Sequence, residues 1–525
     1  MTGGNMLVEQ VSARGSSLTQ SARNRFFLNV GSNICYMVLN TLLLLWYVPF
    51  LIRHIGWAAY GMVPLANTLI MYATVLTTSL DVSVNRFLAI DLNQGNVHSA
   101  NRTFNTALIL AATACLVLAL PAGAVVYLFP ILFNVPAGLE SATRFLFASV
   151  AATMGAALLS SSFGVTSVIT HRFELRNVVR TLTSASRVGV VALCFSFWPA
   201  SLSFVALGFL ISAAIGLAGD VLVWRYLAPE LRVRPRWADR QQMRAMAGLG
   251  GWSAVNQIGS LLLMQVDLLV VNALFGADAT GRYGSILVLV ALVYTMTETV
   301  VAVLSPMIMA HYATADVDAL RRVTLQSVRL LGIALALPVG LLCGFAHPVL
   351  SIWLGGSFGD LGILLILLAG HLPVTLAVRP ILYGITAYNR VKLQSIITLV
   401  LGIATVPAAV LLASFVGWGL AGVASATALV WMVKNVVFLT PYGAAVLGLR
   451  LGALYRSLAS TAALTAGVGL VSAYLWQVCR PADWSGLFAL GAVVGLAYVS
   501  GIYALVLSSA DRELLWSSLR RRSPA

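Results

Sequence analysis

The sequence is poor in charged residues and almost free of lysine. Asp, Glu, Lys and Arg make up 9% of its 525 residues, Lys392 and Lys434 are its two lysines, and 59% of the residues are hydrophobic. A soluble protein carries about 25% charged residues, so this chain has too few charges to cover a surface facing water. The composition excludes a soluble enzyme, a secreted disulfide scaffold and a disordered tail protein. It predicts a polytopic membrane protein.

The chain also lacks the motifs of metal, nucleotide and nucleophilic sites. Its five cysteines are scattered, without the density of a disulfide framework or the spacing of a zinc site, and we interpret them as packing residues. The six histidines include no i, i+4 pair, and there is no Walker A loop, dinucleotide-binding glycine motif or nucleophile elbow. The sequence therefore predicts no metal, no cofactor and no catalytic residue, and it disfavours ATP-driven transport by this chain alone.

Long apolar runs recur from one end of the chain to the other. About 20 apolar residues cross a bilayer as a helix, and about fourteen runs reach that length. Backbone groups in lipid must be hydrogen-bonded within their own segment, so runs of this length predict helices and not barrel strands. The fold prediction is all-α, with candidate spans at 26–52, 62–88, 103–128, 145–169, 181–198, 202–226, 247–273, 284–310, 330–351, 361–384, 393–415, 420–440, 457–478 and 486–508.

The net charge of +15 is consistent with the predicted orientation of these spans. Cytoplasmic loops of membrane proteins collect Lys and Arg, which explains the positive charge without a nucleic-acid partner. If the N-terminus is cytoplasmic, the cations fall in inner loops or inner helix ends, with four exceptions: Arg53, Arg144, Arg282 and Arg480. The prediction is a multi-pass protein with both termini in the cytoplasm.

The longest inner loop, residues 228–246, falls after the sixth span and predicts two six-helix halves around a central cavity. A repeated pattern supports this prediction. Gly56 and Tyr60-Gly61 follow the first span as Gly276 and Tyr283-Gly284 follow the seventh, and transporters are commonly built from repeats. The predicted parts are an N-terminal tail (1–25), the first half (26–227), a basic linker (228–246), the second half (247–440), two additional helices (441–510) and a basic tail (511–525).

Polar residues recur at helical spacing in the first two spans of each half. A polar face on a membrane helix must contact protein or water, because lipid offers no partner. Interhelical hydrogen bonds would account for any single Asn or Thr, but four such stripes together predict a shared hydrated cavity. The predicted cavity residues are Asn33, Asn40, Asn67, Thr78, Asp81, Asn85, Asn256 and Ser260.

Ionisable residues inside the spans have two candidate roles. An acid there either couples transport to a proton or Na⁺, or pairs with a neighbouring arginine; the candidates are Glu298, Asp81 and Asp267. A cation at an inner helix end either snorkels to the headgroups or joins a basic ring that binds a diphosphate, which the planar fork of arginine suits. The candidates for that ring are Arg86, as first choice, with Arg187, Arg379 and Lys434.

Three segments resemble the polysaccharide-transporter branch of the multidrug/oligosaccharidyl-lipid/polysaccharide exporter superfamily. The first span begins Arg25-Phe26-Phe27-Leu28-Asn29 and ends Val48-Pro49-Phe50, the Gly56 to Gly61 turn follows, and the second span closes with Asp81-Val82-Ser83-Val84-Asn85-Arg86-Phe87. The family typically has a glycine near the position of Asp81, where this sequence has an acid.

The resemblance implies a flippase, not an enzyme, in a bacterial inner membrane. Such a protein moves oligosaccharide repeat units on polyprenyl diphosphate between leaflets by alternating access, for exopolysaccharide, O-antigen or capsule biosynthesis. The implied partners are this lipid-linked oligosaccharide, membrane lipids, a polysaccharide polymerase and a chain-length regulator. Alternatives are a multidrug/cation antiporter or a lipid II flippase of the same superfamily. A membrane-integral glycan polymerase lacks its usual large periplasmic loop here, and an acyltransferase has His371 as its one plausible histidine.

Overall fold

The computed structural model describes residues 3–248, 251–314, 316–355, 358, 361–481 and 483–506. This part of the chain contains helices and no strand. Twelve helices within it are long and apolar enough to cross a membrane. The prediction of an all-α polytopic membrane protein is confirmed, and the count of about fourteen spans stays a prediction.

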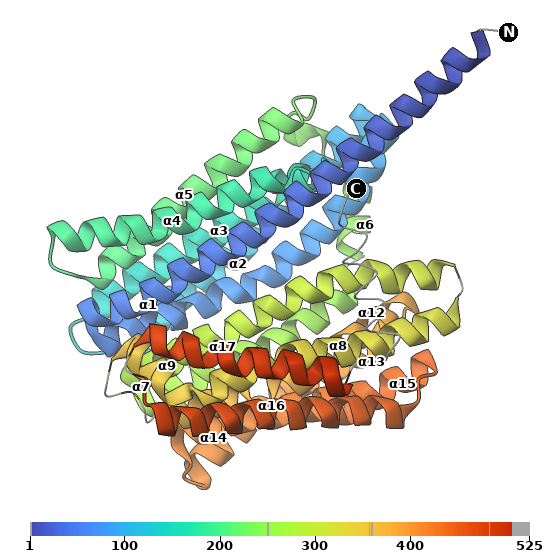
Figure 1. The fold of residues 1–525 in the computed structure, drawn as a ribbon. Helices are drawn as coiled ribbons and strands as arrows, with labels where there is room; N and C mark the ends of the chain where they lie inside the picture. The colour runs from blue at the N-terminus through green and yellow to red at the C-terminus, as the bar shows by residue number, and fades with distance from the viewer. Residues whose placement is uncertain are drawn as a thin grey trace. The chain divides into compact units, whose positions relative to one another are not determined.

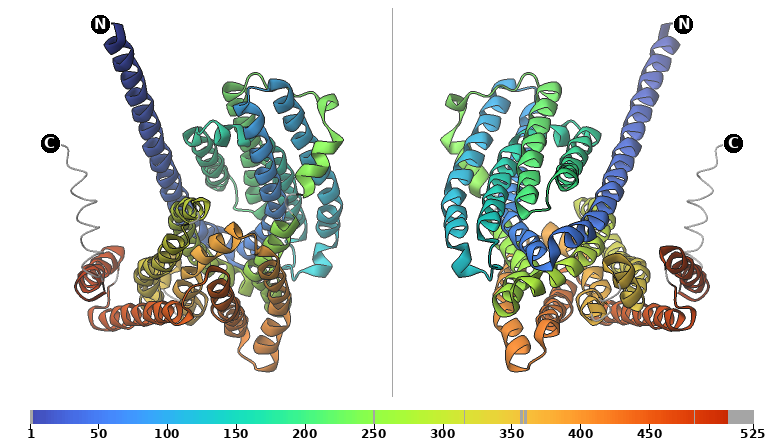
Figure 2. Two further views of the ribbon diagram at one scale, coloured as in Figure 1. Left: turned by 90° about the vertical axis from the view of Figure 1, so that its right-hand side faces the viewer. Right: turned by 90° about the vertical axis from the view of Figure 1, so that its left-hand side faces the viewer.

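The chain divides into two compact helical units, Met1–Gly284 (unit 1) and Ser285–Ala525 (unit 2). In unit 1, α3 packs along α5, and α4 packs against both α5 and α1 (Figures 1 and 2). Its elements are α1 (Gly3–Asn93), α2 (Val97–Leu132), α3 (Glu140–Ile169), α4 (Phe173–Phe197), α5 (Leu202–Leu227), the 3₁₀ turn η1 (Pro235–Trp237), α6 (Arg240–Gly248) and the first part of α7 (Gly251–Ala313).

Unit 2 contains the rest of α7 and a bundle in which α16 packs along α8. Several of its helices are short or continue as π-helix, which carries wider turns than an α-helix. Its elements are α8 (Val317–Gly344), α9 (Ala346–Leu354), α10 (Gly362–Ala369), α11 (Leu372–Ala377), α12 (Arg379–Ala387), α13 (Val391–Val410), η3 (Leu411–Phe415), α14 (Gly419–Met432), η4 (Val433–Leu439), α15 (Thr440–Leu447), α16 (Leu451–Cys479), α17 (Trp484–Gly501) and η5 (Ile502–Val506).

Helices α1 and α7 are each interrupted at a glycine. Gly56 has φ 77° and ψ 170°, and Gly276 has φ 82° and ψ −172°, so two helices meet at each position. A residue with a side chain rarely adopts this backbone conformation. Both interruptions fall in loops that the sequence predicts, between the first and second spans and between the seventh and eighth.

Two span boundaries differ from the prediction. Helix α4 begins at Phe173, eight residues before the predicted start at 181, because the arginines of its first two turns belong to the helix and not to a loop. The predicted span 361–384 is three short helices, α10 to α12, with breaks near Gly370 and Val378. The predicted tail 511–525 lies outside the described residues, and the predicted domain boundaries stay a prediction.

The helical segments that follow the two interruptions approach closely within unit 1. A Cβ atom on Gly61 would lie 2.2 Å from the carbonyl oxygen of Ala277, and one on Gly281 would lie 2.4 Å from the carbonyl oxygen of Trp57. Membrane helices approach this closely where small residues bring backbone against backbone. Gly61, which belongs to the repeated pattern in the sequence, and Gly281 therefore lie in one helix contact.

We expect Gly281→Leu to destabilise unit 1, because the new side chain would overlap the backbone near Trp57. Overpacking of this kind costs about 1–3 kcal/mol. Thermal unfolding of the detergent-purified protein would measure the loss. The matched control is Gly123→Leu on α2, where a new Cβ meets nothing within 4 Å; equal loss in both variants would contradict the proposed contact.

Candidate functional site

Two acids and two arginines meet inside unit 1. Asp81 of α1 and Asp220 of α5 both interact electrostatically with Arg176 and Arg180 of α4. The Ser160 hydroxyl of α3 hydrogen-bonds to Asp220. Arg176 and Arg180 are four residues apart and share one helix face, so α4 presents both guanidinium groups together. We call Asp81, Arg176, Arg180 and Asp220 the Asp81 cluster.

The sequence pattern predicts a site at Asp81 but not at the other three members of this cluster. Arg176 and Arg180 fall in a predicted inner loop, and Asp220 falls within the sixth predicted span. The missed signal is the spacing of Arg176, Arg180 and Arg187, which fall within about 40° of one another at 100° per residue. Opposite charges that face one another reduce the cost of keeping each in an apolar bundle.

Arg187 continues this face of α4 and is held by an aromatic ring. Its Cζ lies 4.3 Å from the centroid of the Phe209 ring, and its Nε donates to Ser212 Oγ at 3.3 Å. Tyr36 and Tyr47 of α1 are close enough to interact electrostatically with it. A cation over an aromatic face is stabilised by the ring's negative π-surface. The Phe209 ring and the Ser212 hydroxyl therefore stabilise the charge of Arg187 within unit 1.

The polar stripe of α1 faces α4. Asn177 Nδ2 donates to Asn33 Oδ1 at 2.8 Å and to Ser32 Oγ at 3.0 Å, and Asn29 Nδ2 donates to the carbonyl oxygen of His171 at 3.0 Å. These bonds are the interhelical contacts that the sequence left open as an explanation for single asparagines. Asn33 therefore serves helix packing, and a role in substrate contact stays a prediction.

The other predicted residues of unit 1 are placed as follows. Asn40, Asn67, Asn256 and Ser260 are half-buried, and the side chain of Thr78 lies outside the described residues. Asn85 Oδ1 is buried and has no hydrogen-bond partner among the described residues, while Arg86 is exposed. Asp267 is 2% exposed and accepts a 2.7 Å hydrogen bond from the Tyr283 hydroxyl, which joins the two segments of α7 across Gly276.

Three predicted residues come together in unit 2. Arg379 forms an ion pair with Glu298, and Lys434 lies close enough to Arg379 for their like charges to interact. Lys434 is 6% exposed, and its Nζ lies 4.9 Å from the centroid of the Trp431 ring. Unit 2 thus holds two cations beside one acid, with Lys434 buried and the Glu298 side chain half-exposed. We call Glu298, Arg379 and Lys434 the Arg379 cluster.

Irregular backbone positions both cations of this cluster. Arg379 begins α12 directly after the break at Val378 and precedes Pro380, which has no N–H to continue the preceding helix. Lys434 lies in the π-helix η4, which ends just before Pro441; that proline cannot donate to the carbonyl of Val437. Broken helices and π-turns in membrane transporters often line substrate and ion sites.

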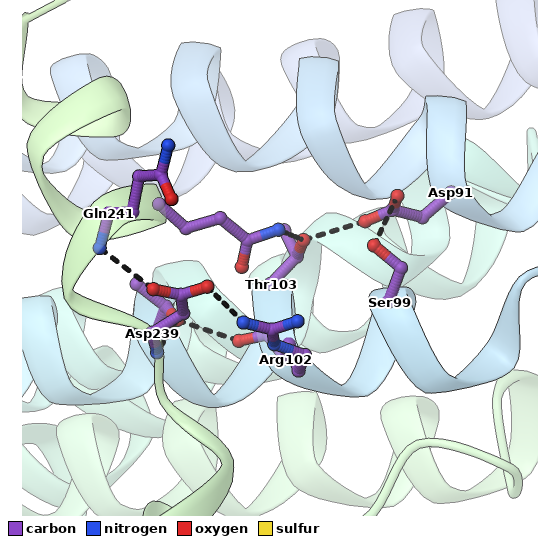
Figure 3. A network of polar contacts seen from close by, with 8 residues as sticks. Asp91, Ser99, Arg102, Thr103, Asp239 and Gln241 are labelled. Carbon is purple, nitrogen blue, oxygen red and sulfur yellow. Dashed lines mark hydrogen bonds and ion pairs between the residues drawn. The ribbon is translucent and has the colours of Figure 1, made fainter.

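The linker between α5 and α6 is bonded to the first part of α2 (Figure 3). Arg102 of α2 forms an ion pair with Asp239 of the linker. On the same part of α2, the Thr103 hydroxyl donates to Asp91 Oδ2 at 2.6 Å and the Ser99 hydroxyl donates to Asp91 Oδ1 at 2.8 Å. Helix α2 therefore fixes the linker on one side and the end of α1 on the other, a role that the sequence analysis did not assign.

Two relatives match most of this chain. The membrane protein EpsK of Bacillus subtilis is 29% identical over 510 residues, which cover 95% of this chain and 99% of that protein. The putative O-antigen transporter of Shigella flexneri is 24% identical over 376 residues, covering 70% of this chain and 85% of that protein. No family model matches the sequence.

Solved structures show the same fold at low sequence identity. An inward-facing multidrug-resistance transporter of the MATE family, in the MOP superfamily, aligns with a TM-score of 0.65 and 16% identity, covering 80% of this chain and 96% of that one. The lipid II flippase MurJ, in an inward closed conformation, aligns with a TM-score of 0.61 and 12% identity, covering 91% and 98%. The chain has the fold of these transporters, and the resemblance seen in the sequence is confirmed by its relatives and neighbours.

Glu298→Gln should destabilise unit 2, because it leaves Arg379 and Lys434 without their acid. Breaking a buried pair costs about 3–5 kcal/mol, and the half-exposed side chain of Glu298 reduces this to about 1–2 kcal/mol. Adding Arg379→Gln should restore part of the loss, as measured by thermal unfolding. Asp278→Asn, in the exposed pair with Arg282, is the control; an unchanged melting temperature for Glu298→Gln would refute the pairing.

Proposed function

We propose that this protein is a flippase for oligosaccharides linked to polyprenyl diphosphate. The observation that carries the proposal is the Arg379 cluster, in which two cations lie beside one acid in unit 2. A diphosphate brings more than one negative charge into an apolar bundle, and it would meet an excess positive charge there. The guanidinium fork of Arg379 suits two phosphate oxygens, and Lys434 supplies a compact point charge.

The relatives support a lipid-linked substrate over a free one. One is named a putative O-antigen transporter, and MurJ, with the same fold, is named a lipid II flippase. Both names describe movement of a sugar-bearing group across a membrane. The half-buried amides of Asn40 and Asn67 on α1 are suitable hydrogen-bonding groups for a sugar moiety.

Within this proposal, the protein lies in the bacterial inner membrane with both termini in the cytoplasm. The candidate cations for the headgroup are Arg86 and Arg187 within unit 1, and Arg379 and Lys434 within unit 2. Alternating access would expose the bound headgroup to each leaflet in turn. A polysaccharide polymerase and a chain-length regulator would then use the product on the outer face.

Ion coupling is proposed for acids that already have a cation in reach. Glu298 pairs with Arg379, and Asp81 interacts with Arg176 and Arg180, so a proton, Na⁺ or anionic substrate would compete within each cluster. Competition of this kind links ion release to substrate binding, because both change the same electrostatic balance. Asp267 is the weakest of the three candidates, since its hydrogen bond to Tyr283 already gives it a packing role.

The second candidate function is multidrug/cation antiport, which the MATE neighbour favours at the level of fold. An organic cation would need a site with excess negative charge, whereas the Arg379 cluster has the opposite excess. His371, the residue considered for acyltransferase chemistry, contacts the Thr375 hydroxyl at 3.3 Å in unit 2.

Purified protein in proteoliposomes should move a polyprenyl-diphosphate-linked oligosaccharide to the leaflet where an impermeant glycosidase cleaves it. Arg379→Gln and Lys434→Gln should each reduce the initial rate at least tenfold, since a charge-assisted hydrogen bond to phosphate contributes about 1.5–3 kcal/mol. Glu298→Gln should remove the response of the rate to an imposed pH or Na⁺ gradient.

Lys392→Gln, an exposed cation near the start of α13, is the matched control and should transport like the parent protein. Melting temperatures of all variants separate loss of transport from loss of fold. Normal transport by both Arg379→Gln and Lys434→Gln would overturn the assignment of the diphosphate site. Transport of ethidium but of no lipid-linked sugar would establish the antiporter instead.

A further inference from the structure

A cavity of about 580 Å³ lies in unit 1 where α5 meets the linker. Trp224 and Val221 of α5, Phe163 of α3 and Leu231 of the linker line it. Trp224 is 6% exposed and Leu231 is 2% exposed, and the rings of Trp224 and Phe163 have centroids 5.2 Å apart. The volume is within the range of small-molecule sites, and these walls are apolar and aromatic.

The same cavity has two cations and no acid among its lining residues. Arg225, next to Trp224 on α5, and Arg232, next to Leu231 on the linker, both line it and are both exposed. The indole Nε1 of Trp224 is buried and has no hydrogen-bond partner among the described residues. A ligand that fits must therefore combine an apolar part with negative charge at one end.

The linker wall of the cavity is fixed by two asparagines of α2. Asn101 Oδ1 accepts from the backbone N–H of Arg232 at 2.7 Å, and Asn101 Nδ2 donates to the carbonyl oxygen of Glu230 at 3.1 Å. Asn105, one turn further along α2, makes the same pair of bonds two residues further along the linker. Its Oδ1 accepts from Arg234 N–H at 2.6 Å, and its Nδ2 donates to the Arg232 carbonyl oxygen at 2.9 Å. The linker thus lies extended along α2, as a strand lies along its neighbour, and the cavity keeps its shape.

The position of the cavity along α5 indicates the source of the ligand. Helix α5 is a candidate membrane span, and Trp224 and Arg225 lie in its last turn. Trp is enriched where the apolar core of a bilayer meets the headgroups, and basic pockets at the cytoplasmic ends of membrane helices bind anionic lipid headgroups. On the predicted orientation, this end of α5 lies in the cytoplasmic leaflet.

We propose that this cavity binds an anionic phospholipid of the surrounding membrane. Arg225 and Arg232 take the phosphate, and Trp224, Phe163 and Val221 contact the glycerol and the upper acyl chains. The site is separate from the Asp81 and Arg379 clusters, and the proposal does not rest on the proposed transport function. The bound lipid joins α5 to the linker, so we expect it to stabilise unit 1.

Native mass spectrometry of the delipidated full-length protein, titrated with phosphatidylglycerol, tests the proposal. Arg225→Gln combined with Arg232→Gln should weaken binding of the first lipid at least tenfold. The control combines Arg234→Gln with Arg236→Gln, which removes the same amount of charge, all of it from the linker, without changing the cavity lining. This control should bind as the parent protein does, and thermal unfolding should show lipid-dependent stabilisation in the parent and the control alone.

Further arms identify the ligand. Val221→Trp fills the cavity without changing charge and should also weaken binding, while Arg225→Lys should retain most of it. Equal weakening by the two double variants would show general attraction of anionic lipid to a basic surface and overturn the proposal. Equally tight binding of phosphatidylcholine would do the same. Saturation by glycerol 3-phosphate alone, at the affinity of the lipid, would identify a water-soluble anion as the ligand and overturn the lipid assignment.

Discussion

Lipid offers charged and amide side chains no partner, and this constraint governs where such groups lie in the protein. Each unit places its ionisable residues against others of the same unit: Asp81 and Asp220 against the arginines of α4, and Glu298 against Arg379. The Asp81 cluster holds two acids and two arginines, whereas the Arg379 cluster holds one acid and two cations. The positive surplus of the Arg379 cluster would attract an anionic headgroup.

Features set by composition and local backbone chemistry could be predicted from the sequence. Apolar runs and turn glycines predict the helical spans and the interruptions at Gly56 and Gly276, because lipid and a positive φ each admit few solutions. The positions of Glu298, Arg379 and Lys434 within apolar runs also indicated charge inside the spans. Their meeting in one cluster follows from the packing of α7, α12 and η4, which the sequence does not contain as a pattern.

Features that depend on tertiary contact could not be predicted in this way. Helix α4 begins at Phe173 because Arg176 and Arg180 find acids on α1 and α5, whereas hydropathy assigned those arginines to a loop. At the end of the π-helix around Lys434, the hydroxyl groups of Thr440 and Tyr455 donate to the carbonyl oxygens of Asn435 and Val436. The sequence gives no sign that Asn101 and Asn105 differ from other polar helix residues, because their role depends on the linker that packs beside them.

The most direct test of mutual neutralisation inside the bundle is a double-mutant cycle on Asp220 and Arg176. The free energy of unfolding in mixed micelles would be measured for the parent protein, Asp220→Asn, Arg176→Gln and the combined variant. The account predicts a coupling energy of about 1–3 kcal/mol, because each single change leaves a charge unmatched. The same cycle on Asp220 and the exposed Arg225 of the same helix should be additive. Additivity within about 0.5 kcal/mol for Asp220 and Arg176 as well would contradict the account.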